Sequence, residues 1–185
     1  MHILGVCNPS GEDNSYNGLY LTKSELQHIC DSGEFKNVPV LTEHGGASCG
    51  TVVSAFLDNT GQLNAIMEID ETQAIGAIAA GFVRDGINQE LSLGYSVDVT
   101  HSNENGSKQK TAGRKTIMEV SLVNQGARDK CYVLAYEDAN SARTKFIERK
   151  DEVHSPVKSL CTDEDSLKNA VQSKDLKDWA VFGIA

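Results

Sequence analysis

Three residues that lie far apart in the sequence have side chains that could act together in catalysis. Ser92 has a hydroxyl group, His44 an imidazole that can accept its proton, and Glu119 a carboxylate that can hold the imidazole in place. Serine is a weak nucleophile until a base takes its proton, and that base works best when a third group orients its ring. Ser92, His44 and Glu119 are therefore the candidate catalytic residues of an acyl-transfer site.

Each of the three also has an ordinary explanation. Ser92 could be a plain strand serine, His44 a structural histidine, and Glu119 a solvated strand glutamate. Only the distances between the three side chains can decide between the catalytic and the ordinary explanations. These distances depend on the strands and turns that carry the residues.

Ser92 lies in the most regular stretch of the chain. From residue 91 to residue 100, apolar and polar residues alternate without interruption, which predicts a half-buried β-strand. On the polar face Ser92 is next to Gly94, a position without a side chain, where an extended substrate could lie. The apolar face consists of Leu91, Leu93, Tyr95, Val97 and Val99.

His44 and Glu119 also fall in predicted strands. Residues 38–44 (VPVLTEH) are a strand candidate, and the two glycines that follow leave the His44 ring approachable. Residues 115–123 (KTIMEVSLV) are another, with Glu119 on the same face as Ser121. A carboxylate between apolar neighbours has to find a partner or lie at the solvated face, and a histidine is a suitable partner.

The rest of the pattern predicts a β-rich chain with a few helices. Thr22 and Glu25 predict a capping box at the start of a short helix that buries Leu26 and Ile29. Asp70 is expected to open the next helix. Its apolar positions at helical spacing are Ile75, Ile78, Ala79, Phe82 and Val83.

The remaining segments divide between strands, a loop and charged helices. The polar residues 102–115 predict a mobile loop between strands. Further strands are expected at residues 2–7, 51–57, 62–69 and 131–136, and further helices at about 140–151 and after residue 162.

The composition is that of an ordinary globular protein. The chain has 185 residues, 39% of them hydrophobic, which suits one domain with a sizeable core. Its formal net charge of -9 argues against a general nucleic-acid binder. No apolar run approaches the ~20 residues of a membrane span, and the N-terminus lacks the layout of a secretory signal. We therefore expect neither nucleic acid nor a membrane as a partner.

The five cysteines and five histidines are widely scattered. They show no metal-ligand spacing, so we expect no metal and no cofactor. The odd cysteine count indicates a reducing compartment. Cys49 or Cys131 could be the nucleophile of a different hydrolase, although a buried, inert thiol is the more ordinary state in such apolar surroundings.

Three blocks of this sequence resemble the capsid maturation serine proteases, which are herpesvirus assemblin and the prohead proteases of tailed bacteriophages. Residues 38–44 resemble the segment that ends in the catalytic histidine, and residues 91–94 (LSLG) the strand with the nucleophile. Residues 119–128 (EVSLVNQGAR) resemble the strand with the third catalytic residue and the loop that builds the oxyanion site. The order His, Ser, third member also matches. The resemblance runs from about residue 5 to residue 136.

The resemblance implies a fold as well as a site. It implies an α+β domain with a single β-barrel-like antiparallel sheet core surrounded by helices. The whole chain would be one protease domain, with a β-rich core at about 1–136 and a helical C-terminal part at about 137–185. In the site, Ser92 would attack the peptide, His44 would act as base and then acid, and Glu119 would orient His44. The backbone N–H of Ala127, with Arg128 acting directly or through water, would stabilise the oxyanion.

The function implied is that of a viral serine endopeptidase. Such an enzyme cleaves the internal scaffold protein, and itself, during capsid maturation, commonly after alanine, and an end at Ala185 fits that pattern as well as it fits an arbitrary end. The resemblance further implies a homodimer through the C-terminal helices. It places the enzyme inside the assembling procapsid, in the host nucleus if herpesvirus-like and in the bacterial cytoplasm if phage-like.

Glu119 is the departure from the herpesvirus pattern. Those enzymes have a second histidine there, whereas phage-type relatives use an acid, so His101 and His154 stay open as alternatives for the third role. Among functions, a non-enzymatic β-rich binding or structural module, in which Ser92 and His44 never meet, also stays open.

Overall fold

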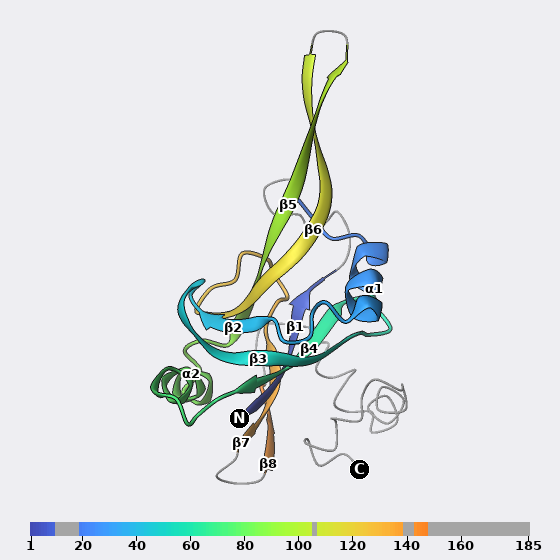
Figure 1. The fold of residues 1–185 in the computed structure, drawn as a ribbon. Helices are drawn as coiled ribbons and strands as arrows, with labels where there is room; N and C mark the ends of the chain where they lie inside the picture. The colour runs from blue at the N-terminus through green and yellow to red at the C-terminus, as the bar shows by residue number, and fades with distance from the viewer. Residues whose placement is uncertain (10–18, 105–106, 139–142, 148–185) are drawn as a thin grey trace.

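The computed structural model describes residues 1–9, 19–104, 107–138 and 143–147 (Figure 1). In this part of the chain one mixed sheet of eight strands forms the centre, in the order β5-β6-β2-β3-β4-β1-β7-β8. The strands are β1 (His2–Asn8), β2 (Pro39–Thr42), β3 (Gly45–Leu57), β4 (Leu63–Ile69), β5 (Glu90–Glu104), β6 (Ser107–Val123), β7 (Val133–Asp138) and β8 (Arg143–Phe146). The helices are α1 (Lys23–Ser32) and α2 (Ala74–Arg84).

The expected α+β fold, an antiparallel barrel surrounded by helices, is wrong. The described chain is mainly strand, and its two helices do not enclose the sheet. The sheet is mixed because β2 runs parallel to β6, with Val40 beside Val120. It is also open. The beginning of β5 meets the chain before β7 only at an isolated bridge between Glu90 and Tyr132, and no continuous ladder joins the two in the residues described.

The core lies on the inner face of this curved sheet. The neighbouring strands β4, β1 and β7 are buried at nearly every described position, and the start of β5 and the end of β6 also bury consecutive residues rather than alternate ones. The largest fully buried side chains come from the strands, from helix α1 and from the connecting segments: Tyr132, Phe35, Ile3, Leu21, Leu26, Ile29, Leu63, Ile66, Met67, Ile69 and Leu91.

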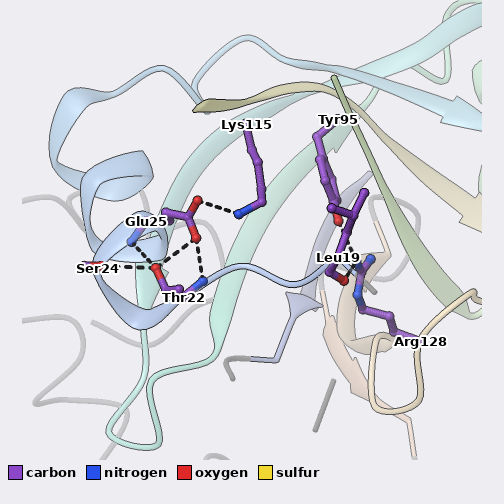
Figure 2. A network of polar contacts seen from close by, with 7 residues as sticks. All are labelled: Leu19, Thr22, Ser24, Glu25, Tyr95, Lys115 and Arg128. Carbon is purple, nitrogen blue, oxygen red and sulfur yellow. Dashed lines mark hydrogen bonds and ion pairs between the residues drawn. The ribbon is translucent and has the colours of Figure 1, made fainter. Parts of the chain in front are cut away.

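Helix α1 begins as its sequence predicts. Thr22 is the N-cap, its side chain accepts from the Glu25 N–H at 3.2 Å, and the Glu25 carboxylate accepts from the Thr22 N–H at 2.7 Å (Figure 2). Leu26 and Ile29 are buried, and Gly33 ends the helix in a left-handed conformation. Lys115 of β6 then pairs with Glu25 at 2.7 Å, which ties the helix to the sheet.

Helix α2 differs from its prediction at its start and in part of its buried face. Its N-cap is Gln73, since the Asp70 carboxylate instead accepts from the N–H of Thr72 in the preceding turn. The buried residues are Gly76, Ala79, Ala80 and Val83, while Ile78 and Phe82 are exposed. The helix packs through its small residues because its backbone lies close to its neighbours: a Cβ on Gly76 would overlap the Asp70 carbonyl of the preceding turn and lie 3.1 Å from the Cys49 carbonyl of β3.

The segment 102–115, expected to be a loop, is instead part of a long hairpin. Strands β5 and β6 pair continuously to Glu104 and Ser107, and they project from the body as a twisted ribbon (Figure 1). Backbone ladder bonds do not depend on side-chain polarity, so a polar sequence gave no sign of this pairing. Irregularities at Gly94/Tyr95 and Val97/Val99 interrupt the alternation, and Val99 is exposed.

The C-terminal prediction is corrected where the structure describes it. Residues 143–146, expected to be helical, form strand β8 against β7, so the β-rich part extends past residue 136. The remaining predicted helical segment, 148–185, lies outside the described residues. Neither α1 nor α2 has the length and apolar character to cross a membrane.

Candidate active site

His44 lies in the tight turn between β2 and β3 rather than at the end of a strand. Thr42 pairs with Gly45, and both residues between them have positive φ, 50° for Glu43 and 58° for His44. Two-residue hairpin turns of type I′ need positive φ at both central positions. The turn presents the imidazole at the rim of the sheet, where 48% of the side chain is exposed.

Three hydrogen bonds hold this turn against the end of β6. The Glu43 N–H donates to the Leu122 carbonyl at 3.1 Å, and the Glu43 carboxylate accepts from the Asn124 N–H at 2.9 Å. The His44 N–H donates to the Ser121 hydroxyl at 3.1 Å. The backbone that carries His44 is therefore fixed relative to the strand that carries Glu119.

The structure brings His44 and Glu119 together. Nδ1 of His44 lies 2.8 Å from Oε1 of Glu119, across 75 residues of sequence. The Glu119 side chain is only 13% exposed, so this contact is partly shielded from water. An ionised carboxylate can only accept, so in a pair with ionised Glu119 the imidazole donates through Nδ1, and a neutral ring then has Nε2 as its proton acceptor. This is the tautomer that a general base needs.

Ser121 completes this pair, and its role was missed in the sequence. Its hydroxyl donates to Oε2 of Glu119 at 2.6 Å while accepting the His44 N–H. Ser121 is fully buried. The i, i+2 spacing from Glu119 was the available signal, because residues two apart in a strand share one face.

Ser92 lies on the strand next to this cluster. It pairs directly with Ser121 across β5 and β6, and Gly94 pairs with Glu119. Directly paired residues share a face, with Cβ atoms about 4.5–5.5 Å apart. Ser92 is 6% exposed, and within the described chain no hydrogen bond joins its hydroxyl to His44. The structure thus places Ser92 on the same face as the His44–Glu119 pair, one residue pair away, without direct contact.

Gly94 makes room for the carboxylate. A Cβ at this position would overlap the Glu119 carboxylate, whose Oε1, Cδ and Cγ atoms fill the space above the Gly94 backbone. The missing side chain at Gly94, which in the sequence suggested space for a substrate, instead leaves space that the Glu119 carboxylate fills.

The loop after β6 packs against the strand that carries Ser92. The Gly126 N–H donates to the Glu90 carboxylate at 2.6 Å, and a Cβ on Gly126 would lie 3.0 Å from the Leu91 carbonyl. Ala127 follows and is exposed. The loop therefore touches β5 one and two residues before Ser92. Donation by the Ala127 N–H to an oxyanion stays a prediction.

Arg128 contacts Tyr95 and the N-terminal part of the chain (Figure 2). Its Nη2 donates to the Tyr95 hydroxyl at 2.7 Å and to the Leu19 carbonyl at 3.3 Å, and its side chain is buried. These bonds hold residue 19, the Arg128 loop and β5 together. Action of Arg128 on an oxyanion stays a prediction too.

The two cysteines considered as alternative nucleophiles are buried thiols. Burial raises the pKa of Cys49 to about 11 and that of Cys131 to about 12. Reactive cysteines have lowered pKa values, because the thiolate is the attacking species. Their surroundings therefore do not favour either thiol as a nucleophile.

Nothing that the structure describes places either alternative histidine, His101 or His154, next to His44 and Glu119. His101 lies in the β5–β6 ribbon, paired with Lys110, and His154 is outside the described residues. Within those residues, no three His, Cys, Asp or Glu side chains are arranged to hold a metal ion.

Comparison with known proteins gives no further assignment: no family model and no curated protein matches this chain.

Proposed function

We propose that this protein is a viral serine endopeptidase that cleaves the internal scaffold protein, and itself, during capsid maturation. The observation that carries the proposal is the 2.8 Å contact between His44 Nδ1 and Glu119 Oε1. Two residues chosen for their chemistry, on elements far apart in sequence, form the base and orienter of a serine nucleophile. The scaffold as substrate rests on the sequence resemblance alone.

In the proposed mechanism Ser92 Oγ attacks the peptide carbonyl while His44 Nε2 takes its proton. The imidazolium that forms keeps its Nδ1–H on Glu119, whose negative charge stabilises it. His44 then gives the proton to the leaving amine, and water repeats the sequence on the acyl-enzyme. The Ala127 N–H, together with Arg128, would stabilise the oxyanion, and one such donor is typically worth about 3 kcal/mol.

The separation of Ser92 from His44 is compatible with this mechanism. Catalytic hydrogen bonds in substrate-free enzymes are often long and shorten when substrate binds. The His44 side chain is 48% exposed, so a substrate can reach it.

A fluorophosphonate probe tests the proposal directly, because it reacts with activated serines. We expect one label per chain, located at Ser92 by peptide mapping, and its loss in Ser92→Ala and in His44→Ala. Ser96→Ala, an exposed serine on the same strand, is the matched control and should label normally. A label that survives Ser92→Ala, or no label on folded wild-type protein, rejects the protease assignment in favour of a non-enzymatic module.

A further inference from the structure

The Ser121 hydroxyl forms a second link between His44, the proposed base, and Glu119, the carboxylate that orients it. It donates to Oε2 of Glu119 at 2.6 Å and accepts from the backbone N–H of His44 at 3.1 Å. Both parts of the pair thus depend on one buried oxygen atom.

The donated bond determines which carboxylate oxygen faces His44. Glu119 has two equivalent oxygens, and a freely rotating carboxyl group would offer either of them, or neither, to Nδ1. With Oε2 held by Ser121, Oε1 is the oxygen left for the imidazole at 2.8 Å. A hydrogen bond to an ionised acceptor is also stronger than a neutral one, so this restraint is a firm one.

The accepted bond holds the turn. His44 has a φ of 58°, a conformation that L-residues rarely adopt, and its N–H needs an acceptor at the rim of the sheet. Ser121 also pairs directly with Ser92 across β5 and β6, so it is the strand neighbour of the proposed nucleophile as well as the partner of the pair.

We propose that Ser121 is a positioning residue of this site, which fixes Glu119 and the His44 turn in the arrangement required for proton transfer. The proposal rests on the proposed protease function for its kinetic consequence. It concerns a residue to which the sequence resemblance assigned no role.

The test compares Ser121→Ala with Ser121→Thr, which keeps the hydroxyl, using two independent measurements. The first is the proton NMR signal of the His44 Nδ1–H, identified by its absence in His44→Ala. It should be observable in wild type, lost through faster exchange in Ser121→Ala, and restored in Ser121→Thr. Ser92→Ala should keep it, because that change leaves the pair intact.

The second measurement is the hydrolysis of a peptide with alanine before the cleaved bond. Ser121→Ala should lower kcat roughly 10- to 100-fold, the effect of one hydrogen bond to a charged group, with KM unchanged and recovery in Ser121→Thr. Thermal melting checks that each variant is folded. If Ser121→Ala does not fold, Ser121→Cys, similar in volume but a weak donor, replaces it.

The two proposals fail in different ways. An unchanged Nδ1–H signal and unchanged kcat in folded Ser121→Ala would overturn the positioning role while leaving the protease assignment intact. Wild-type protein that hydrolyses no peptide and takes no probe overturns the protease assignment, while the NMR comparison still decides whether Ser121 holds the pair.

Discussion

Gly94 of β5 lies directly opposite Glu119 of β6, and the glutamate side chain lies over the glycine backbone. The space that a Cβ would occupy is filled by the carboxylate that contacts His44. The site is therefore compatible with a glycine two residues after Ser92, and incompatible with a larger residue unless Glu119 moves.

Gly94→Ala should break the His44–Glu119 contact without removing either residue. The methyl group forces the carboxylate away, so we expect loss of the His44 Nδ1–H signal and of peptide hydrolysis in a folded protein. Gly81→Ala is the matched control: its Cβ meets nothing within 4 Å, and it should stabilise α2 by roughly 0.5–1 kcal/mol. Normal hydrolysis by Gly94→Ala would show that the Glu119 position matters little.

Glu119→Gln should leave the shape of the site almost unchanged while removing its negative charge. The amide can no longer stabilise the imidazolium, and it can hold the wrong tautomer, so kcat should fall on the order of 10⁴-fold. Steady-state hydrolysis measures this, with the exposed strand residue Glu68→Gln as control. A near-normal rate would return the third role to His101 or His154.

Alkylation should separate a serine mechanism from a cysteine mechanism. With a pKa of about 11 for Cys49 and about 12 for Cys131, at most about one thiol in a thousand is ionised at pH 8. Iodoacetamide should leave both residues unmodified in the folded protein, by mass spectrometry, and modify them in denaturant. Rapid labelling of either one in the folded state, with loss of hydrolysis, would revive the cysteine alternative.

The ion pair between Glu25 and Lys115 should make stability depend on pH. Burial raises the pKa of Glu25, but hydrogen bonds from Lys115 and Thr22 outweigh it, and the pKa lies below its ordinary value of 4.5. A lowered carboxyl pKa contributes stability above the unfolded-state value, and this contribution is lost as the pH falls through the folded-state value. Lys115→Met should therefore lower the melting temperature at pH 7 and have little effect near pH 2.

Arg114→Met is the control for that measurement, because Arg114 pairs with Glu34 on the surface with 64% of its side chain exposed. Exposed pairs contribute little, so its melting temperature should stay near wild type at both pH values. Equal losses in the two variants would mean that burial of the Lys115 pair is unimportant.

Local sequence patterns were enough to predict features whose interacting residues are close together in the sequence. Thr22 and Glu25 are three residues apart, so the capping box follows from residue types alone. Alternation likewise placed Ser92 with Gly94 on one face of their strand, and Glu119 with Ser121 on one face of theirs. The turn at residues 58–61 and the hairpin around it follow in the same way. In each case the relative position of the interacting groups follows from the period of the strand or helix, or from their short separation along the chain.

Sequence patterns did not determine the fold class, because periodicity identifies a strand but not its neighbours. The parallel pairing of β2 with β6, the open edge between β5 and β8, and strand β8 itself all depend on partners distant in sequence. For α2, helical spacing correctly included Ala79 and Val83 in the buried face, but it wrongly included Ile78 and Phe82, which are exposed because the closest packing uses glycine and alanine.

What the sequence by itself determined about the site is its chemistry: a hydroxyl, an imidazole and a carboxylate on strands or their ends. What only the tertiary structure decided is their arrangement. The β2–β6 pairing carries the His44 turn to Glu119, Ser121 and Gly94 fix that carboxylate, and Ser92 stands one pair away. The physical reason is that a 2.8 Å contact across 75 residues is set by strand order and register, which no local pattern of residues contains.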